Sequence, residues 1–304
     1  MLICYDRSAD AEQAIDSAAV LLSPRRAVVL DVAAPLTVAE SFAEMSSVVP
    51  GTAFEDLNEA DALQGARAGA ARAVRAGLPA EARASVAAPR WEGIVEVANE
   101  LDAAVIVVGS RGLSGLREVA HGSPSHQLAE HARRPVLIVP PRTQNASAAR
   151  RPQRTDAANV TGRPILICYD GSERARAAVE TAAALLTSRQ AVVLDVVPVM
   201  IAEGYSAMPS DAPWVDQVDV TEARERAEAG AELARRLGFE AEPRADSATS
   251  TWRGVTEVAD AIDAAVIAIG SRGLKGLREV VERSISHDVA THARRPVLIV
   301  PPGR

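Results

Sequence analysis

Residues 103–125 read AAVIVVGSRGLSGLREVAHGSPS and carry the clearest structural signal in the chain. An apolar run rich in β-branched residues is followed by glycines, then by Ser123 and Pro124. Serine is a good N-cap, and proline is a good first residue of a helix. A buried strand that leads through a short loop into a helix is the repeating unit of a parallel α/β sheet. The stretch therefore predicts a strand over 103–108 and a helix from Ser123 to Ala132.

A near copy of this stretch begins at Ala264, 161 residues later. The same offset aligns HARRPVLIVPP at His131 with an identical segment at His292. Near the start of each half the offset is 164 instead, since ICYD occurs at Ile3 and again at Ile167. The chain is therefore an internal duplication whose second half is three residues shorter.

The length of 304 residues also suits two domains, since a domain usually has about 150 residues. The segment between the copies is rich in Arg, Ala, Thr, Asn and Gln and has no apolar periodicity, which is typical of an exposed linker. We predict a first domain over 1–141, a linker over 142–163 and a second domain over 164–304.

Apolar strand candidates alternate with helical segments in both halves, which favours a parallel sheet covered on both faces. We predict two doubly wound, Rossmann-like α/β domains, each with a five-stranded parallel sheet flanked by helices. Ligands of such sheets bind beyond the carboxyl ends of the strands. Helices are expected over 8–22, 55–76, 91–101 and 123–132, and strands over 2–5, 27–32, 82–88, 103–108, 136–139, 165–169, 191–196, 241–247, 264–269 and 297–300.

The composition excludes several classes of protein. Hydrophobic residues make up 48% of the chain and aromatic residues 3%, so the core should be aliphatic, and the net charge of −7 argues against a nucleic-acid partner. Cys4 and Cys168 fall inside the first strand of each half, where they are expected to be buried and unpaired. No apolar run reaches about 20 residues and no signal peptide is recognisable, which predicts a cytoplasmic protein that does not contact membranes. Met1 lies so close to the first strand that a start further upstream is left open.

The glycines after the fourth strand follow the pattern G-x-x-G, nine residues, then G-S, at Gly109, Gly112, Gly122 and Ser123. Glycine lets backbone N–H groups approach an anion, and the helix that follows directs free N–H groups and a positive dipole end at it. The alternative is that these glycines only form turns. The pattern is neither the dinucleotide fingerprint, which follows the first strand, nor a P-loop, which needs GxxxxGK[ST].

Asp6 and Asp170 come directly after the first strand of each half, where a carboxylate can accept hydrogen bonds from a ribose hydroxyl or a base amine. Their alternative role is to cap the following helix. The histidines His121, His126 and His131 are five residues apart, a spacing that does not place them on one helical face, so no metal site is predicted. Trp91 and Trp252 open equivalent helices and are expected to be packing anchors.

With these motifs the chain resembles a tandem universal stress protein over both halves, excluding only the linker. The resemblance implies that Asp6 and Val32 contact ribose and adenine, that Val108 lines the adenosine pocket, and that Gly112, Gly122, Ser123 and Ser125 hold phosphates. In the second half it implies a matching set of Asp170, Val196, Ile269, Gly270, Gly273, Ser284 and Ser286. Two positions depart from the family pattern. Arg283 replaces the third glycine of the second half, which predicts weakened or altered binding there, and Arg7 stands where the second half has Gly171.

The resemblance implies an ATP-binding stress-response module, with Mg²⁺ as a candidate counter-ion and an unidentified protein as partner. No arrangement for phosphoryl transfer is legible, so no catalytic residue is assigned and little or no catalysis is expected. A slow adenine-nucleotide hydrolase and a structural stress protein with vestigial sites remain the alternatives. The fifth strands end in Pro-Pro, as edge strands can. By resemblance they would pair the halves as an intrachain pseudo-dimer, and a homodimer of chains is left open.

Overall fold

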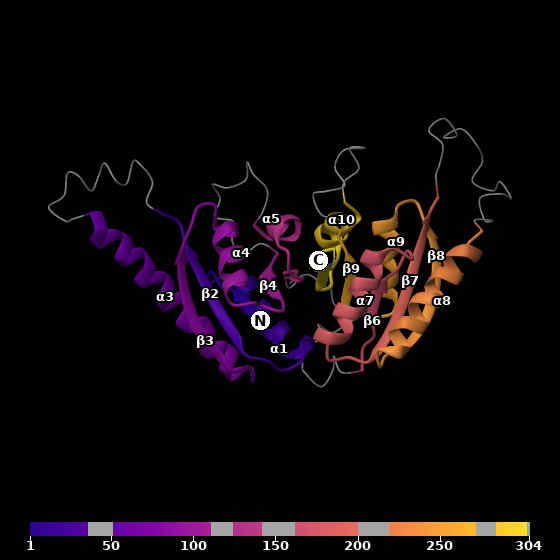
Figure 1. Ribbon diagram of the computed structural model, residues 1–304, viewed down its shortest axis with the longest axis horizontal. Coiled ribbons are helices and arrows are strands. Elements are labelled where there is room, and N and C mark those ends of the chain that lie inside the picture. Colours follow the sequence, from indigo (N-terminus) through magenta and orange to yellow (C-terminus); the bar gives the residue numbers. More distant parts are fainter. Residues whose placement is uncertain (36–50, 111–123, 142–161, 200–218, 272–283, 303–304) are drawn as a thin grey trace, which may run out of the picture. The chain divides into compact units, whose positions relative to one another are not determined.

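The computed structural model describes residues 1–35, 51–110, 124–141, 162–199, 219–271 and 284–302. The chain divides into two compact units, Met1–Thr155 and Asp156–Arg304. Each unit has its own sheet and its own helices (Figure 1). No helix in the described part of the chain is both long and apolar enough to cross a membrane.

The first unit is a doubly wound α/β domain. Its strands follow the order β3-β2-β1-β4-β5, and every neighbouring pair is parallel. Helices α1 and α3 contact one another, and so do α4 and α5, so each pair covers one face of the sheet. The elements are β1 (Leu2–Cys4), α1 (Ala9–Leu21), β2 (Ala27–Ala33), α3 (Gly51–Arg75), β3 (Ala80–Val86), α4 (Arg90–Glu100), β4 (Ile106–Gly109), α5 (Pro124–His131) and β5 (Val136–Val139).

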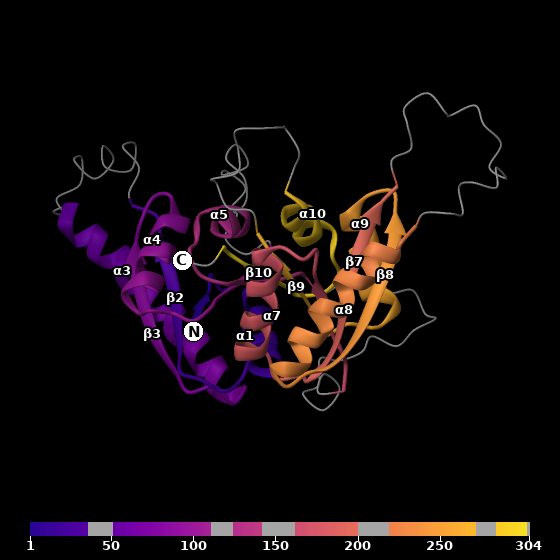
Figure 2. The same cartoon turned by 45° about the vertical axis from the view of Figure 1, so that its right-hand side comes forward.

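The second unit repeats this arrangement. Its strands follow the order β10-β9-β6-β7-β8, again with parallel neighbours, and α7 contacts α8 while α9 contacts α10. Figure 2 shows α8 running along β7 and β8. The elements are β6 (Ile165–Cys168), α7 (Glu173–Leu185), β7 (Gln190–Pro198), α8 (Thr221–Arg236), β8 (Glu240–Ala248), α9 (Thr251–Ala261), β9 (Val266–Gly270), α10 (Ile285–His292) and β10 (Val297–Val300). The predicted fold class is confirmed in both halves.

Aliphatic side chains fill both cores, as the composition predicts. Strands β5 and β10 are buried at every position, which is expected of parallel strands covered on both faces. Ile3 and Ile167, which are equivalent residues of the central strands β1 and β6, have no exposed surface. Burial of such side chains contributes about 1.5–3 kcal/mol each to stability.

The sequence placed the start of the fourth strand three residues too early. Residues 103–105 are apolar but precede β4, because the chain there still closes the end of α4. Asp102 adopts φ +46°, and the Ala103 N–H donates to Ala98 O at 2.9 Å, the bond of a Schellman helix end. The second half does the same at Asp263, with φ +53°. The first residues of the apolar run therefore close the helix end, and the strand begins only after them.

Candidate functional site

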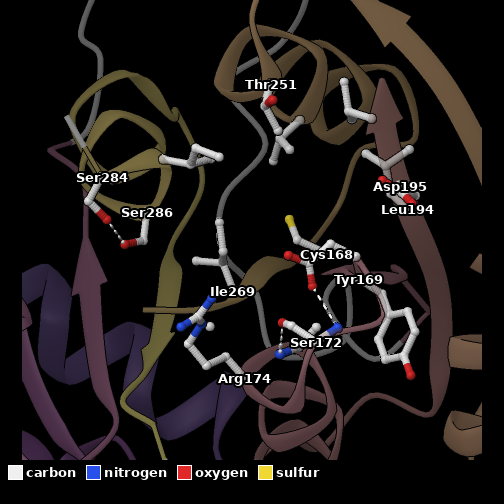
Figure 3. Close-up of a pocket in the computed structure, with 16 residues that line it drawn as sticks. Cys168, Tyr169, Ser172, Arg174, Leu194, Asp195, Thr251, Ile269, Ser284 and Ser286 are labelled. Atoms are coloured by element: carbon white, nitrogen blue, oxygen red, sulfur yellow. Dashed lines mark hydrogen bonds between the residues drawn. The ribbon is translucent and has the colours of Figure 1, made fainter. Parts of the chain in front are cut away.

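A cavity opens at the carboxyl ends of the central strands of the second half, β6, β7 and β9. The starts of α7, α9 and α10 complete its wall (Figure 3). The chain winds in opposite directions on either side of the β6–β9 pair, so the cavity lies at the switch point where such folds bind ligands. All six described members of the predicted second-half site line it, namely Asp170, Val196, Ile269, Gly270, Ser284 and Ser286. Gly273 and Arg283 lie outside the described residues.

Asp170 organises the turn that leads from β6 into α7. Its Oδ1 accepts a hydrogen bond from the Ser172 N–H at 3.0 Å, and Ser172 Oγ accepts one from the Ala175 N–H at 3.2 Å (Figure 3). Ser172 is therefore the N-cap of α7, and the aspartate holds the residue that caps. Burial raises the pKa of Asp170, but hydrogen bonds from Ser172 outweigh it and leave the pKa below its ordinary value. The carboxylate is ionised at neutral pH and can accept hydrogen bonds.

Ser284 and Ser286 bring two hydroxyls to the first turn of α10. Ser284 is the N-cap residue, and its Oγ lies 2.8 Å from Ser286 Oγ, with which it shares a hydrogen bond (Figure 3). Ser286 is buried at the cavity wall. Hydroxyl donors at a helix N-terminus favour an anion, because the free N–H groups of the first turn point the same way.

The cavity also contains charged residues that the sequence did not single out. Asp195 lines it from the carboxyl-terminal half of β7, and its side chain is only 8% exposed. Burial raises the pKa of Asp195. Arg226 of α8 opposes this rise, because its Nε donates a hydrogen bond to Asp195 Oδ2 at 2.6 Å. Arg174, in the first turn of α7, is a second arginine, and it lines the cavity directly. These residues escaped notice because aspartate and arginine on separate elements form no short sequence motif.

Cys168 differs from the expectation of a buried strand cysteine. It is free and lines the cavity, where its side chain keeps some exposure, whereas Cys4 is free and buried. Burial of the sulfur still raises the pKa of Cys168 to about 12, so the group remains a neutral thiol at physiological pH. Its place at the last residue of β6, where the cavity opens, accounts for the difference.

The predicted residues of the first half lie at the corresponding ends of its strands. Asp6 Oδ1 accepts hydrogen bonds from Ser8 N at 3.0 Å and Ser8 Oγ at 2.5 Å, so Ser8 caps α1 as Ser172 caps α7. Val32 and Val108 are buried in β2 and β4. Gly109 is the last residue of β4, and Ser125 Oγ donates a hydrogen bond to Ser110 O at 3.3 Å. The other predicted residues of this half, Gly112, Gly122 and Ser123, lie outside the described residues.

Asp31, next to Val32, is the first-half counterpart of Asp195. Burial raises its pKa to about 6, and the positive charges of Arg7 and Arg90 oppose the shift. Arg7 Nε lies 4.0 Å from Asp31 Oδ2, and Arg7 adopts φ +64° where Gly171 adopts +81°. The Nε of Arg90 is buried and finds no hydrogen-bond partner among the described residues.

The tryptophans pack against histidines rather than facing a ligand. The Trp91 and His131 ring centroids are 4.6 Å apart, and those of Trp252 and His292 are 4.2 Å apart. Each pair joins the helix before the fourth strand of its half to the helix after it. Within the described ranges, no three His, Cys, Asp or Glu side chains gather closely enough to hold a metal ion.

These features define the chain as a tandem of doubly wound α/β domains with a candidate ligand site at the switch point of the sheet. A model of the universal stress protein family matches residues 1–140 and again residues 162–301, and the chain belongs to that family.

Three individual proteins are similar to this chain. Universal stress protein YxiE of Bacillus subtilis is 31% identical over 144 residues, which cover 46% of this chain and 97% of that protein. A universal stress protein structure from Archaeoglobus fulgidus has a TM-score of 0.62 at 20% identity and covers 100% of this chain and 96% of its own. Another structure from that organism is a complex with dAMP, with 23% identity, a TM-score of 0.33, and coverage of 46% of this chain and 98% of its own.

Proposed function

We propose that this protein binds an adenine nucleotide at the carboxyl ends of its strands and acts in the cytoplasm as a nucleotide-dependent stress-response module. ATP is the proposed ligand, with Mg²⁺ as its counter-ion. One observation carries the proposal. Six residues spread from Asp170 to Ser286, named from the sequence through its resemblance to the family, line a single cavity at the switch point of the second sheet.

The cavity offers the kinds of surface that a nucleotide requires. Val196 and Ile269 offer apolar surface for a base, and Asp170 offers a carboxylate to a hydroxyl or an amine. Ser284 and Ser286 offer hydroxyls and a helix start to phosphate. The first half has the full glycine pattern in its sequence and equivalent residues at its strand ends.

Binding would act by shifting conformational populations rather than by driving a reaction. Such a shift needs a ligand with different affinities for two states of the protein, and the nucleotide-binding loops are where those states would differ. Efficient phosphoryl transfer needs a metal held by carboxylates and a group that positions the nucleophile. The cavity offers Asp170 and Asp195 as its only described carboxylates, and Asp195 is paired with Arg226. Slow hydrolysis remains the second candidate, and turnover above the spontaneous rate that is lost in Asp170→Asn would favour it.

The test is calorimetric titration of nucleotide-stripped protein with ATP and Mg²⁺. Asp170→Asn should weaken binding in the second half roughly tenfold by removing a charged acceptor. Glu180→Gln, which removes the same charge from the exposed face of α7, is the matched control and should bind as the wild type does. Gly122→Arg should weaken the first half, and Arg283→Gly should strengthen the second. Absence of binding heat in every variant would refute the proposal and leave a structural stress protein.

A further inference from the structure

The two halves place opposite charges at the same point beside the candidate site. Asp10 in the first turn of α1 and Arg174 in the first turn of α7 are equivalent, since they are 164 residues apart. The backbone around them matches closely. A Cβ added to Gly109 would lie 3.1 Å from the Asp10 Cβ, and one added to Gly270 would lie 3.0 Å from the Arg174 Cβ. Both side chains therefore leave the backbone beside the residue where a glycine loop begins.

Arg174 lies inside the cavity. In Figure 3 its guanidinium and the hydroxyls of Ser284 and Ser286 lie on one side of the cavity, while Leu194 and Asp195 lie on the other. The side chain is half-buried, and no described carboxylate forms a salt bridge with it. Arg174 acts on Asp170 only at longer range, where its positive charge is a minor cause of the lowered pKa of the Asp170 carboxyl. A guanidinium that lines the same cavity as two hydroxyls, with its donors unused among the described residues, fits a phosphate.

The first half has its described cations elsewhere. Arg7 and Arg90 both act on Asp31, at the end of β2, whereas the position beside Gly109 holds the Asp10 carboxylate. Arg90 is replaced by Thr251 in the second half, and that threonine lines the cavity. Compared with the first half, the second half therefore lacks the cation of Arg90 near the end of its second strand, β7. It has the added cation of Arg174 beside its glycine loop.

We infer that Arg174 makes the second site selective for phosphorylated ligands through a charge contact that the first site, with Asp10 in the equivalent place, does not have. The inference rests on the proposed adenine-nucleotide binding and names a residue that determines ligand specificity in the second half. Arg174 thereby gives the second half a charge contact to phosphate, which compensates for the replacement of the third glycine of the pattern by Arg283. An arginine–phosphate contact is commonly worth a factor of roughly 10 to 100 in affinity.

The experiment must report on each half within the full-length chain. Hydrogen exchange read by mass spectrometry does so, because peptides over residues 2–14 and 165–178 have different masses and cover the two turns. Protection is titrated with adenosine, AMP and metal-free ATP in the presence of EDTA. In the wild type, AMP should protect the second half at concentrations at least tenfold lower than adenosine does.

Variants separate charge from structure. Arg174→Gln should lower AMP affinity in the second half at least tenfold and leave adenosine affinity unchanged, and Arg174→Lys should restore part of the loss. Arg176→Gln removes the same charge from an exposed position of the same helix and should change neither. Asp10→Arg should lower the AMP concentration that protects the first half and leave the adenosine concentration unchanged.

Two results would overturn the inference, and they differ from failure of the proposed function. Equal protection of the second half by adenosine and AMP would show that Arg174 does not select phosphate, while nucleotide binding itself stands. Equal loss of adenosine and AMP affinity in Arg174→Gln would show a structural role instead. Absence of protection by every ligand in both halves would refute the binding proposal and this inference together.

Discussion

The first and second halves have the same topology, but the arginine that pairs with the aspartate near the end of the second strand comes from a different element in each half. Asp31 is approached by Arg7, which precedes α1, and the position on α3 that faces both is Gly65. In the second half the arginine is on α8, as Arg226, and the position equivalent to Arg7 is Gly171. The two substitutions occupy equivalent positions and are reciprocal, because Arg226 corresponds to Gly65.

The exchanged positions lie close together around each aspartate. A Cβ on Gly65 would meet the Asp31 carboxylate and would lie 2.6 Å from Arg7 Nε, so a side chain there would require the Arg7 side chain to shift. In the second half, a Cβ on Gly171 would lie 3.5 Å from Arg226 Cδ, an ordinary contact distance, but its φ of +81° favours glycine. A duplicated site can therefore keep a charge pair while the residue that provides it moves to another element.

The largest expected effect tests whether the halves share one packing plan. Ile3→Ala and Ile167→Ala each remove a fully buried side chain from equivalent central strands, and each should cost about 3–4 kcal/mol of unfolding free energy. Denaturant unfolding, with hydrogen exchange in each half as a local probe, measures both. A difference of more than about 2 kcal/mol between the two variants would mean that the cores relax differently around a cavity despite matching topology.

The arginine exchange should produce the next largest effect, and an unequal one. Arg226→Ala leaves Asp195, 8% exposed, without its partner at 2.6 Å, which should cost about 2–3 kcal/mol at pH 7. Arg7→Gly loses a longer and more exposed contact and relieves a left-handed backbone, so its net effect should stay within about 1 kcal/mol. Arg224→Ala, exposed on the same turn of α8, is the control for the first variant. Equal costs for Arg7 and Arg226 would contradict the asymmetry of the two pairs.

The fold could be predicted because its signals are local and occur twice. Apolar runs, the serine N-caps and Gly77, which closes α3 with φ +91°, follow directly from residue type. The predicted lining of the second cavity came from the resemblance to the family, which the spaced glycine and serine motifs carry. Arg174 and the Arg226–Asp195 pair did not, because their importance depends on which elements meet in space. One signal was available, since aligning positions 7 with 171 and 65 with 226 shows the exchanged arginine and glycine.

The pH dependence of Asp31 provides a smaller effect. Burial raises its pKa from 3.8 to about 6, so the folded chain binds more protons than the unfolded chain between those values. The contribution of Asp31 to stability is therefore greatest below about pH 4 and is lost as pH rises through about 6. Between pH 4 and pH 7, Asp31→Asn should gain roughly 1–3 kcal/mol relative to the wild type. Parallel unfolding curves at both pH values would show that Asp31 has an ordinary pKa.

The smallest effect should be the same in both halves. Ser8 Oγ accepts from Ala11 N at 3.1 Å, and Ser172 Oγ accepts from Ala175 N at 3.2 Å, so each caps its helix in the same way. Ser8→Ala and Ser172→Ala should each cost about 1 kcal/mol, and threonine at either position should restore most of it. Hydrogen exchange of the first-turn amides of α1 and α7 resolves the two sites. Because these caps also hold Asp6 and Asp170 in place, a loss confined to one half would mean that only that half depends on its serine to shape the ligand end of its sheet.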